Sequence, residues 1–301
     1  MRQRNSLADQ PSSLAPGAFG VVLAALADSD PPVQRSAFAA VAEIVPDAVL
    51  FAGDAAYAGS SDRKRRSALR RWRSDWGALA RRVYAVPGNH DFDSPNALAC
   101  WREEMAPGPG APEGHEGLAF ALELGPVLAI GMTAARGMVP PAQRAWAAET
   151  LAGASAPHRI AVFHEPAFPN GPRVGESLDA RPADRDELWA ILEEGSVGLV
   201  VNGHEHGYSR RLIRGRRPIV QVVAAGAGGT LHGDRLEGVE RHVPAFHFLE
   251  IAAEPRVLRC RALALDGRVI DAFEIAPGIP SPSGERERPR RSPVSRERAP
   301  S

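Results

Sequence analysis

Short apolar segments that each end in a cluster of polar residues are the feature that most restricts the fold of this chain. Residues 83–86 form one such segment, which predicts a buried strand and stops at a Pro-Gly turn signal. Asn89, His90 and Asp91 follow in three successive positions. Because open α/β sheets bind ligands at the carboxyl ends of their strands, this cluster predicts a functional site at a sheet edge.

Four further segments end in the same way. The polar residues after the five segments are Asp28 with Asp30, Asp54 with Tyr57, Asn89 with His90 and Asp91, His164, and His204 with His206. Carboxylates, imidazoles and an amide, without a cysteine thiolate, favour borderline or hard ions such as iron, zinc, manganese or magnesium. The set is too large for one ion and fits two ions that share a carboxylate. Such a pair can clamp the attacking and leaving oxygens of a phosphoryl transfer.

The order of elements predicts an α/β (α+β) fold, a four-layer sandwich of two mixed β-sheets flanked by helices. Strands and helices alternate in the first half of the chain, whereas the second half is mostly strands. Helices are expected near 32–44, 62–80, 141–151 and 184–194. Strands are expected near 20–26, 48–51, 83–86, 118–124, 127–132, 160–163, 197–201, 210–214, 218–225, 245–252, 256–264 and 268–275, and residues 103–117 are expected to form a loop.

A single domain is expected between two less ordered ends. Residues 1–17 are polar, contain Pro and Ser, and predict a flexible N-terminal arm. Residues 277–301 consist largely of Pro, Arg, Glu and Ser and predict a disordered tail. The domain that carries the site is therefore expected to span residues 18–276.

The composition excludes some classes of protein and leaves others open. The 36 basic and 36 acidic residues balance, so a nucleic-acid partner gains no support from net charge. No segment approaches the roughly 18 apolar residues that span a membrane. Cys100 and Cys260 make no disulfide framework; they could pair, but buried free thiols are favoured.

The apolar segment 19–27 has two interpretations. It ends in Ala-Leu-Ala, which resembles the cleavage site of a signal peptide. The segment before it is long and contains the acidic residue Asp9, so we favour a core strand. A cytoplasmic protein is the favoured interpretation, and secretion stays open.

The polar clusters, in this order, resemble the calcineurin-like metallophosphoesterase superfamily. Its sequence blocks stand here as Asp28, Gly53-Asp54, Gly88-Asn89-His90-Asp91, His164 and Gly203-His204-Glu205-His206. The resemblance covers about residues 18–276 and implies that family's fold and a hydrolase acting on phosphoric ester bonds.

The first block departs from the commonest pattern of that superfamily. Most members have Asp-x-His there, whereas this chain has Asp30 at the third position. The purple acid phosphatase branch also lacks that histidine and has a tyrosine three residues after the bridging aspartate, as Tyr57 stands after Asp54. The segments that begin at His164 and at Gly203 also look like that branch.

The resemblance to this branch implies two ligand sets and a reaction. One ion takes Asp28, Asp54, Tyr57 and His206, and the other takes Asp54, Asn89, His164 and His204. Asp54 bridges the ions, which the branch implies to be iron with iron, zinc or manganese. A metal-bound hydroxide attacks a small phosphate monoester, and no phosphoenzyme is expected. His90 stabilises the transition state or protonates the leaving group, and Asp91 orients His90.

Several alternatives stay open. Tyr57 could be an ordinary packed tyrosine, and Asp30 is favoured as a helix N-cap over a ligand. His232 is the best candidate outside the blocks for a substrate contact. The arginine-rich segment 63–73 could attract an anionic substrate, but a solvated helix face is favoured. The competing functions are a phosphodiesterase or nuclease of the same superfamily and a catalytically silent metal-binding module.

Overall fold

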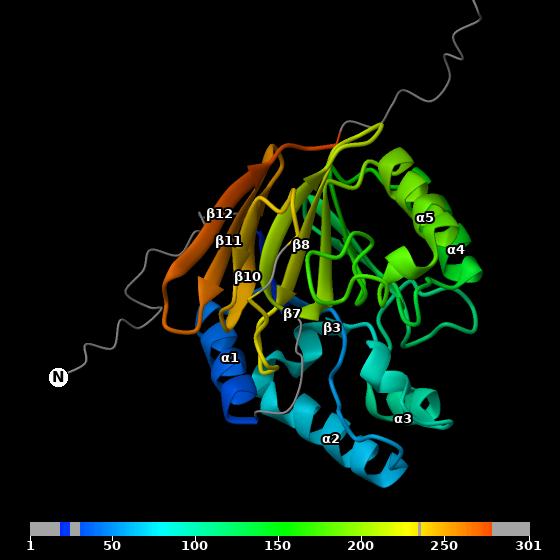
Figure 1. The fold of residues 1–301 in the computed structure, drawn as a ribbon, viewed down its shortest axis with the longest axis vertical. Helices are drawn as coiled ribbons and strands as arrows, with labels where there is room; N and C mark the ends of the chain where they lie inside the picture. The colour runs from blue at the N-terminus through cyan, green and yellow to red at the C-terminus, as the bar shows by residue number, and fades with distance from the viewer. Residues whose placement is uncertain (1–18, 25–30, 234–235, 279–301) are drawn as a thin grey trace, which may run out of the picture.

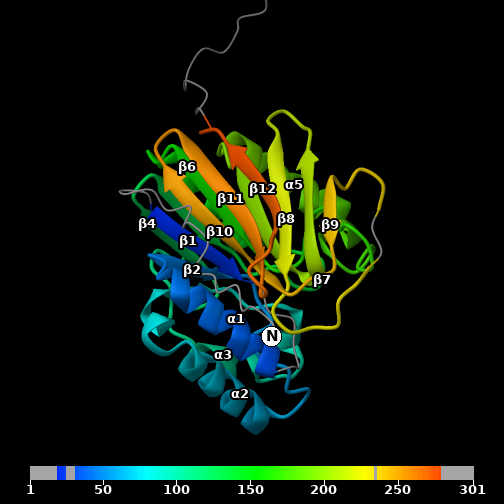
Figure 2. The same ribbon diagram turned by 90° about the vertical axis from the view of Figure 1, so that its left-hand side faces the viewer.

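Two β-sheets packed face to face form the centre of the molecule, and helices cover their outer faces (Figures 1 and 2). The computed structural model describes residues 19–24, 31–233 and 236–278. The predicted arm, Asp28, Asp30 and all but two residues of the predicted tail lie outside these ranges.

The first sheet has the strand order β12-β11-β10-β1-β2-β3. Strands β1, β2 and β3 are parallel, and β10 pairs antiparallel with both β1 and β11. The bounds are β1 Phe19–Ala24, β2 Ala48–Phe51, β3 Val83–Ala85, β10 His247–Glu254, β11 Val257–Ala264 and β12 Val269–Ile275. The predicted core strand near residues 20–26 is therefore confirmed as β1, which lies between β10 and β2.

The second sheet has the order β4-β5-β6-β7-β8, and β9 pairs with β7. Strands β5, β6 and β7 are parallel where they neighbour one another. The bounds are β4 Phe120–Leu124, β5 Val127–Gly131, β6 His158–Val162, β7 Leu199–Ile213, β8 Ile219–Ala225 and β9 Arg241–Val243.

The helices lie outside the two sheets and complete the predicted four-layer sandwich. Their bounds are α1 Pro31–Ile44, α2 Asp62–Asp75, α3 Ala97–Glu104, α4 Pro141–Ala152 and α5 Pro182–Glu194, with 3₁₀ turns at Gly77–Arg82, Asn89–Phe92 and Leu178–Ala180. Among the described residues, no helix combines the length and apolar character that crossing a bilayer requires.

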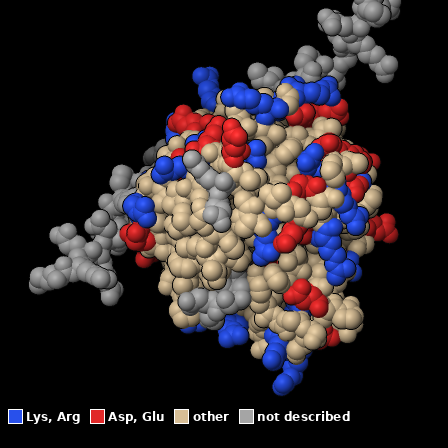
Figure 3. Space-filling model, in the orientation of Figure 1, with Lys and Arg blue, Asp and Glu red and all other residues tan. Residues whose placement is uncertain are grey.

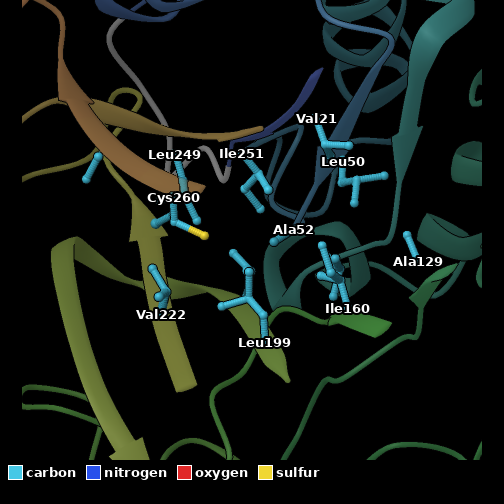
Figure 4. Close-up of a cluster of buried hydrophobic side chains, with 14 of the residues drawn as sticks. Val21, Leu50, Ala52, Ala129, Ile160, Leu199, Val222, Leu249, Ile251 and Cys260 are labelled. Atoms are coloured by element: carbon cyan, nitrogen blue, oxygen red, sulfur yellow. The ribbon is translucent and has the colours of Figure 1, made fainter. Parts of the chain in front are cut away.

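Alternation along the strands explains the layers, because successive side chains point to opposite faces of a sheet. Val21 and Leu50 of the first sheet face Val127 and Ile160 of the second, and this core between the sheets is shown in Figure 4. Val49, next to Leu50, joins a separate cluster with the helices on the outer face. Both faces of the strands are thus buried, as their continuous apolar sequences require.

A third core cluster lies between the second sheet and its helices. Leu128 and Ile130 of β5 pack with Ala147 of α4 and Leu188 of α5 on that outer face. Cys100 and Cys260 are both buried and unbridged, which confirms the prediction of free thiols.

Three local predictions were wrong. The helix expected over residues 62–80 ends at Asp75, since Gly77 adopts a positive φ of 53° and a 3₁₀ turn follows. Strand β3 was expected to be buried, but it is an edge strand with half-buried residues. Helix α3 was not predicted, because its eight residues are fewer than the roughly 11–18 over which helical periodicity can be recognised.

Candidate metal centre

Asp54 lies at the centre of the site. It follows strand β2 after one alanine and one glycine. Its side chain is almost fully buried, and its backbone has a positive φ of 63°. Oδ1 accepts the backbone N–H of His90 at 3.0 Å, and Oδ2 accepts the Tyr57 hydroxyl at 2.9 Å. Nε2 of His164 lies 3.1 Å from the same Oδ2. One carboxylate therefore contacts three other predicted site residues.

Asn89 joins this group to the end of the second sheet. Its Oδ1 lies 3.0 Å from Nε2 of His164 and 3.0 Å from Nδ1 of His204. Asp54, Asn89, His164 and His204 come from four different segments, and they meet because the carboxyl ends of β2 and β3 face those of β6 and β7. This meeting of strand ends is the geometry on which the sequence prediction depended.

The motif Gly203-His204-Glu205-His206 lies inside β7, where the chain turns back. Residues 199–202 run alongside residues 220–223 of β8, whereas residues 206–213 return along β8 in the antiparallel direction. A positive φ of 71° at His204 accompanies this reversal. The reversal spans residues 203–205. His204 lies within it and His206 directly after it, so both histidines are at the same end of the sheet.

The imidazole rings are oriented as metal ligands require. Nδ1 of His164 donates to the Ala52 carbonyl oxygen at 2.7 Å, and Nδ1 of His206 donates to the Thr230 carbonyl oxygen at 3.0 Å. Ligating histidines characteristically donate their second N–H in this way, which leaves Nε2 with a lone pair. Nε2 of His164 then faces an oxygen of Asp54 and an oxygen of Asn89. The lone pairs of these three atoms point toward one another, and a bound cation would stabilise that arrangement.

The electrostatics of the site also fit a metal. Burial lowers the pKa of His204 to about 3 and that of His206 to about 4, so both rings are neutral, as metal binding requires. Burial alone would raise the pKa of Asp54. Without an ion, a proton on Nε2 of His164 takes the place of the cation, and its charge and hydrogen bond more than offset burial and hold the pKa of Asp54 below its usual range. The carboxylate is thus ionised.

Glycines at two of the blocks allow this close approach. A Cβ atom at Gly53, whose φ is +97°, would lie 2.7 Å from Nδ1 of His164. A Cβ atom at Gly88 would collide with the carboxylate of Asp54. Glycine is required at both positions because the site leaves no room for a side chain.

The predicted role of Asp91 is wrong. Asp91 is buried, and its carboxylate accepts backbone N–H groups of Asp54, Ala55, Ala56 and Gly88 at 2.9–3.3 Å. Burial and the neighbouring Asp54 charge raise its pKa. Asp91 therefore fixes the two backbone segments of the site relative to each other and does not orient His90.

Asp93 takes the role that was assigned to Asp91. Its Oδ2 lies 3.0 Å from Nδ1 of His90. The His90 ring also packs on the ring of Tyr57, with 4.1 Å between centroids. These two contacts hold the ring in place and leave its Nε2 directed away from Asp93.

Two buried glutamates, each directly after a predicted histidine ligand, hold neighbouring loops against the site. Glu165 accepts the backbone N–H groups of Arg136 and Gly137, both at 2.7 Å. Glu205 accepts those of Asn170 and Gly171 at 2.7 and 2.9 Å. The repeated His-Glu dipeptide is the sequence signal that could have identified them.

Arg65 is the exception in the arginine-rich helix. It is fully buried, and its guanidinium donates to the carbonyl oxygens of His90 and Gly59, both at 2.8 Å. The other arginines of α2 are exposed except Arg66, which is half-buried, and Arg66 and Arg70 pair with acidic residues of α3. The predicted solvated face is therefore correct for these exposed arginines and wrong for Arg65, which supports the segment carrying His90.

The structure brings most of the predicted site residues together. Asp54, Tyr57, Asn89, His90, His164 and His204 are linked by direct contacts, and His206 lies within range of the Asp54 charge. The ring of His232 lies beside that of His206, with 5.0 Å between centroids. Among the described residues, no three His, Cys, Asp or Glu side chains are placed to hold an ion by themselves. The candidate donor set also includes the Asn89 amide and the Tyr57 phenol, which contact His164 and Asp54 respectively.

Comparisons with known proteins agree with this fold. The family model of calcineurin-like phosphoesterases matches residues 29–208, which is more than half of the chain. The chain therefore belongs to the calcineurin-like phosphoesterase family, and it is a hydrolase acting on phosphoric ester bonds. Metal cofactors are implied by this family membership.

Solved structures share the fold at low sequence identity. A purple acid phosphatase, PPD1 from yellow lupin (Lupinus luteus), is 15% identical with a TM-score of 0.70; the match covers 89% of this chain but only 55% of that one. GAP50, the anchor in the inner membrane complex of Plasmodium, is 11% identical with a TM-score of 0.62 and coverages of 86% and 89%. PhoD is 12% identical with a TM-score of 0.61 and coverages of 89% and 70%. No curated protein sequence matches this chain.

Proposed function

We propose that this chain hydrolyses small phosphate monoesters at a centre of two metal ions. The proposed ligands are Asp28, Asp54, Tyr57, Asn89, His164, His204 and His206, with Asp54 shared between the ions. The observation that carries the proposal is the meeting of Asp54, Asn89, His164 and His204 around common oxygen atoms. We also propose that residues 18–276 form the catalytic domain.

Two ions, when bound, would supply positive charge for the phosphoryl oxygens and lower the pKa of a bound water. Asp54, ionised and buried, offers both of its oxygens to such a pair. The neutral rings of His204 and His206 donate lone pairs without a competing proton.

His90 is proposed as the proton donor to the leaving group. Its backbone N–H is fixed on Asp54, and its ring is fixed between Tyr57 and Asp93. Because the carboxylate of Asp93 holds the proton on Nδ1, Nε2 is the atom that can deliver a second proton to an alkoxide. A positioned acid of this kind contributes about 10²–10⁴-fold to a rate.

Iron paired with iron, zinc or manganese is proposed as the metal content. The Tyr57 hydroxyl lies 2.9 Å from Asp54 Oδ2, which supports the proposal that Tyr57 binds a ferric ion as a phenolate. A ferric phenolate absorbs visible light by charge transfer. The purified protein should therefore be coloured and should contain iron in elemental analysis, and a Tyr57→Phe variant should lose the visible band.

Turnover of a monoester and a diester model substrate tests the reaction. The protein should hydrolyse p-nitrophenyl phosphate faster than bis(p-nitrophenyl) phosphate. A His90→Ala variant should keep its metals while losing about 10²–10⁴-fold in kcat for β-glycerophosphate, a monoester whose leaving group needs a proton. A preference for the diester would indicate a phosphodiesterase or nuclease instead. Metal binding without any turnover would indicate a silent module.

A further inference from the structure

A tight turn beside the candidate centre carries an arginine in an unusual backbone conformation. Ala135 and Met138 exchange backbone hydrogen bonds at 3.2 and 3.4 Å, and the two residues between them are Arg136, with φ +58°, and Gly137, with φ +79°. Asparagine or glycine is preferred at the first of two such left-handed positions. A bulky side chain there costs roughly 1–2 kcal/mol, so the turn itself gives no reason for an arginine.

Glu165 fixes this turn to the candidate centre. Its two carboxylate oxygens accept the backbone N–H groups of Arg136 and Gly137, each at 2.7 Å, and its side chain is 1% exposed. Glu165 directly follows His164 at the end of β6. The turn follows β5, so both segments leave the same edge of the second sheet. The position of Arg136 is therefore coupled to that of a predicted ligand.

The guanidinium of Arg136 extends toward the segment after His90. Its Nη2 lies 3.4 Å from the carbonyl oxygen of Phe92, and Asp93, the next residue, holds the ring of His90. The side chain is exposed and makes no ion pair with a carboxylate of the described residues. By contrast, Arg173 on the loop held by Glu205 pairs with Glu176 at 2.8 Å.

The face of the molecule that Figure 3 displays carries no broad basic patch among the described residues. There, among the described residues, lysines and arginines are interspersed with aspartates and glutamates. An anion that approaches this face therefore meets no broad basic field.

We propose that Arg136 is a specificity-determining residue that binds a second oxyanion, a phosphate or a carboxylate, on the leaving group of the substrate. This inference rests on the proposed phosphomonoesterase function, since it assigns the leaving group to the side of His90. The planar guanidinium suits such a group because it donates two parallel hydrogen bonds to two oxygens. The preferred substrates are then phosphate esters or anhydrides with a second negative charge close to the scissile bond.

Two variants separate the charge of Arg136 from its backbone conformation. Arg136→Asn removes the guanidinium but suits the left-handed conformation and keeps the N–H that Glu165 accepts. Arg136→Lys keeps the positive charge. The matched control is Arg216→Asn, an exposed arginine in the turn between β7 and β8. That turn lies seven residues or more along β7 from His206, which corresponds to about 23 Å.

The measurement is kcat/KM for three substrates. Inorganic pyrophosphate has a phosphate leaving group, phosphoenolpyruvate has a carboxylate on its leaving group, and p-nitrophenyl phosphate has no second oxyanion. Arg136→Asn should lower kcat/KM for pyrophosphate or phosphoenolpyruvate by about 10–100-fold, the equivalent of one charge-assisted hydrogen bond. It should change kcat/KM for p-nitrophenyl phosphate by less than about 3-fold, and Arg136→Lys should recover part of the loss.

Each result has a distinct meaning. A loss confined to one of the two anionic substrates identifies the oxyanion that Arg136 binds. An equal loss for all three substrates would place the arginine on the transferred phosphoryl group, and no loss for any of them would remove it from recognition; both results overturn the inference. If the unmodified protein hydrolyses none of the three, the proposed function itself fails. The melting temperature of Arg136→Asn should be no lower than that of the unmodified protein, because asparagine relieves the cost of the left-handed conformation, so a kinetic loss cannot come from unfolding.

Discussion

Replacement of Asp93 by alanine separates the positioning of His90 from the stability of the fold. Asp93 Oδ2 lies 3.0 Å from His90 Nδ1, and the two side chains are 35% and 32% exposed. Exposed pairs of this kind contribute about 0–1 kcal/mol to stability. In a domain of this size, 1 kcal/mol corresponds to about 2–4 °C in melting temperature, so Asp93→Ala should lower it by no more than that.

The kinetic effect should be larger and should depend on the leaving group. Without Asp93, the His90 ring loses the acceptor that fixes its tautomer and its orientation, although it still packs on Tyr57. We expect kcat to fall by about 10-fold or more for β-glycerophosphate, a part of the full value of a positioned acid. The fall should be smaller for p-nitrophenyl phosphate, because p-nitrophenolate leaves without help from a proton.

The assay is the ratio of kcat for these two substrates, measured together with thermal unfolding. Asp266→Ala is the matched control, since Asp266 is an exposed carboxylate in the turn between β11 and β12. An unchanged ratio in Asp93→Ala would refute the reasoning that Asp93 positions His90. A fall in melting temperature well beyond 4 °C would show that Asp93 acts on the fold instead.

Three further predictions concern the metals, a buried arginine and a buried histidine. Asp54→Asn should lose both ions together in elemental analysis, because Asp54 is the proposed shared ligand; one ion kept at full occupancy would contradict the bridge. Arg65→Met should lower the free energy of unfolding by about 3 kcal/mol, since two buried carbonyl oxygens lose a charged donor, and an unchanged urea midpoint would count against this. Burial lowers the pKa of His247 from 6.5 to about 4. Between these two pH values, His247 is protonated in the unfolded chain but neutral in the folded protein. Its contribution to stability is therefore present above pH 6.5 and is lost as the pH falls, by about 2 kcal/mol at pH 5. Urea midpoints at pH 7.5 and 5.0 should show a smaller loss in His247→Gln than in the unmodified protein, and equal losses would contradict the prediction.

Much of the candidate site could be predicted because its residues occupy fixed places relative to local patterns. Asp54 and His164 follow short apolar strands, and such strands can be recognised from composition over four or five residues. His204 and His206 belong to a motif whose spacing is itself informative. Local patterns also correctly predicted α1, α4 and α5, each of which begins at a proline.

The errors concern side chains whose contacts are set by the tertiary structure and not by the neighbouring sequence. Asp91 and Asp93 both lie near His90 in sequence, and nothing local reveals that Asp91 turns inward to four backbone N–H groups while Asp93 turns to the ring. Arg65 is buried because helix α2 packs over the segment of His90, and its neighbours Arg66 and Arg70 remain outside. A residue type alone cannot distinguish these positions.

By itself, the sequence determined which strands end in donor groups and the chemical types of those donors, because the polypeptide places them next to apolar runs that must be buried. Only the tertiary structure decided that β2 of one sheet and β6 of the other end at the same place, so that Asp54 and His164 come within 3.1 Å. The physical reason is that sheet packing depends on the two inner faces, Val21 and Leu50 against Val127 and Ile160, whose contacts join residues far apart in the chain.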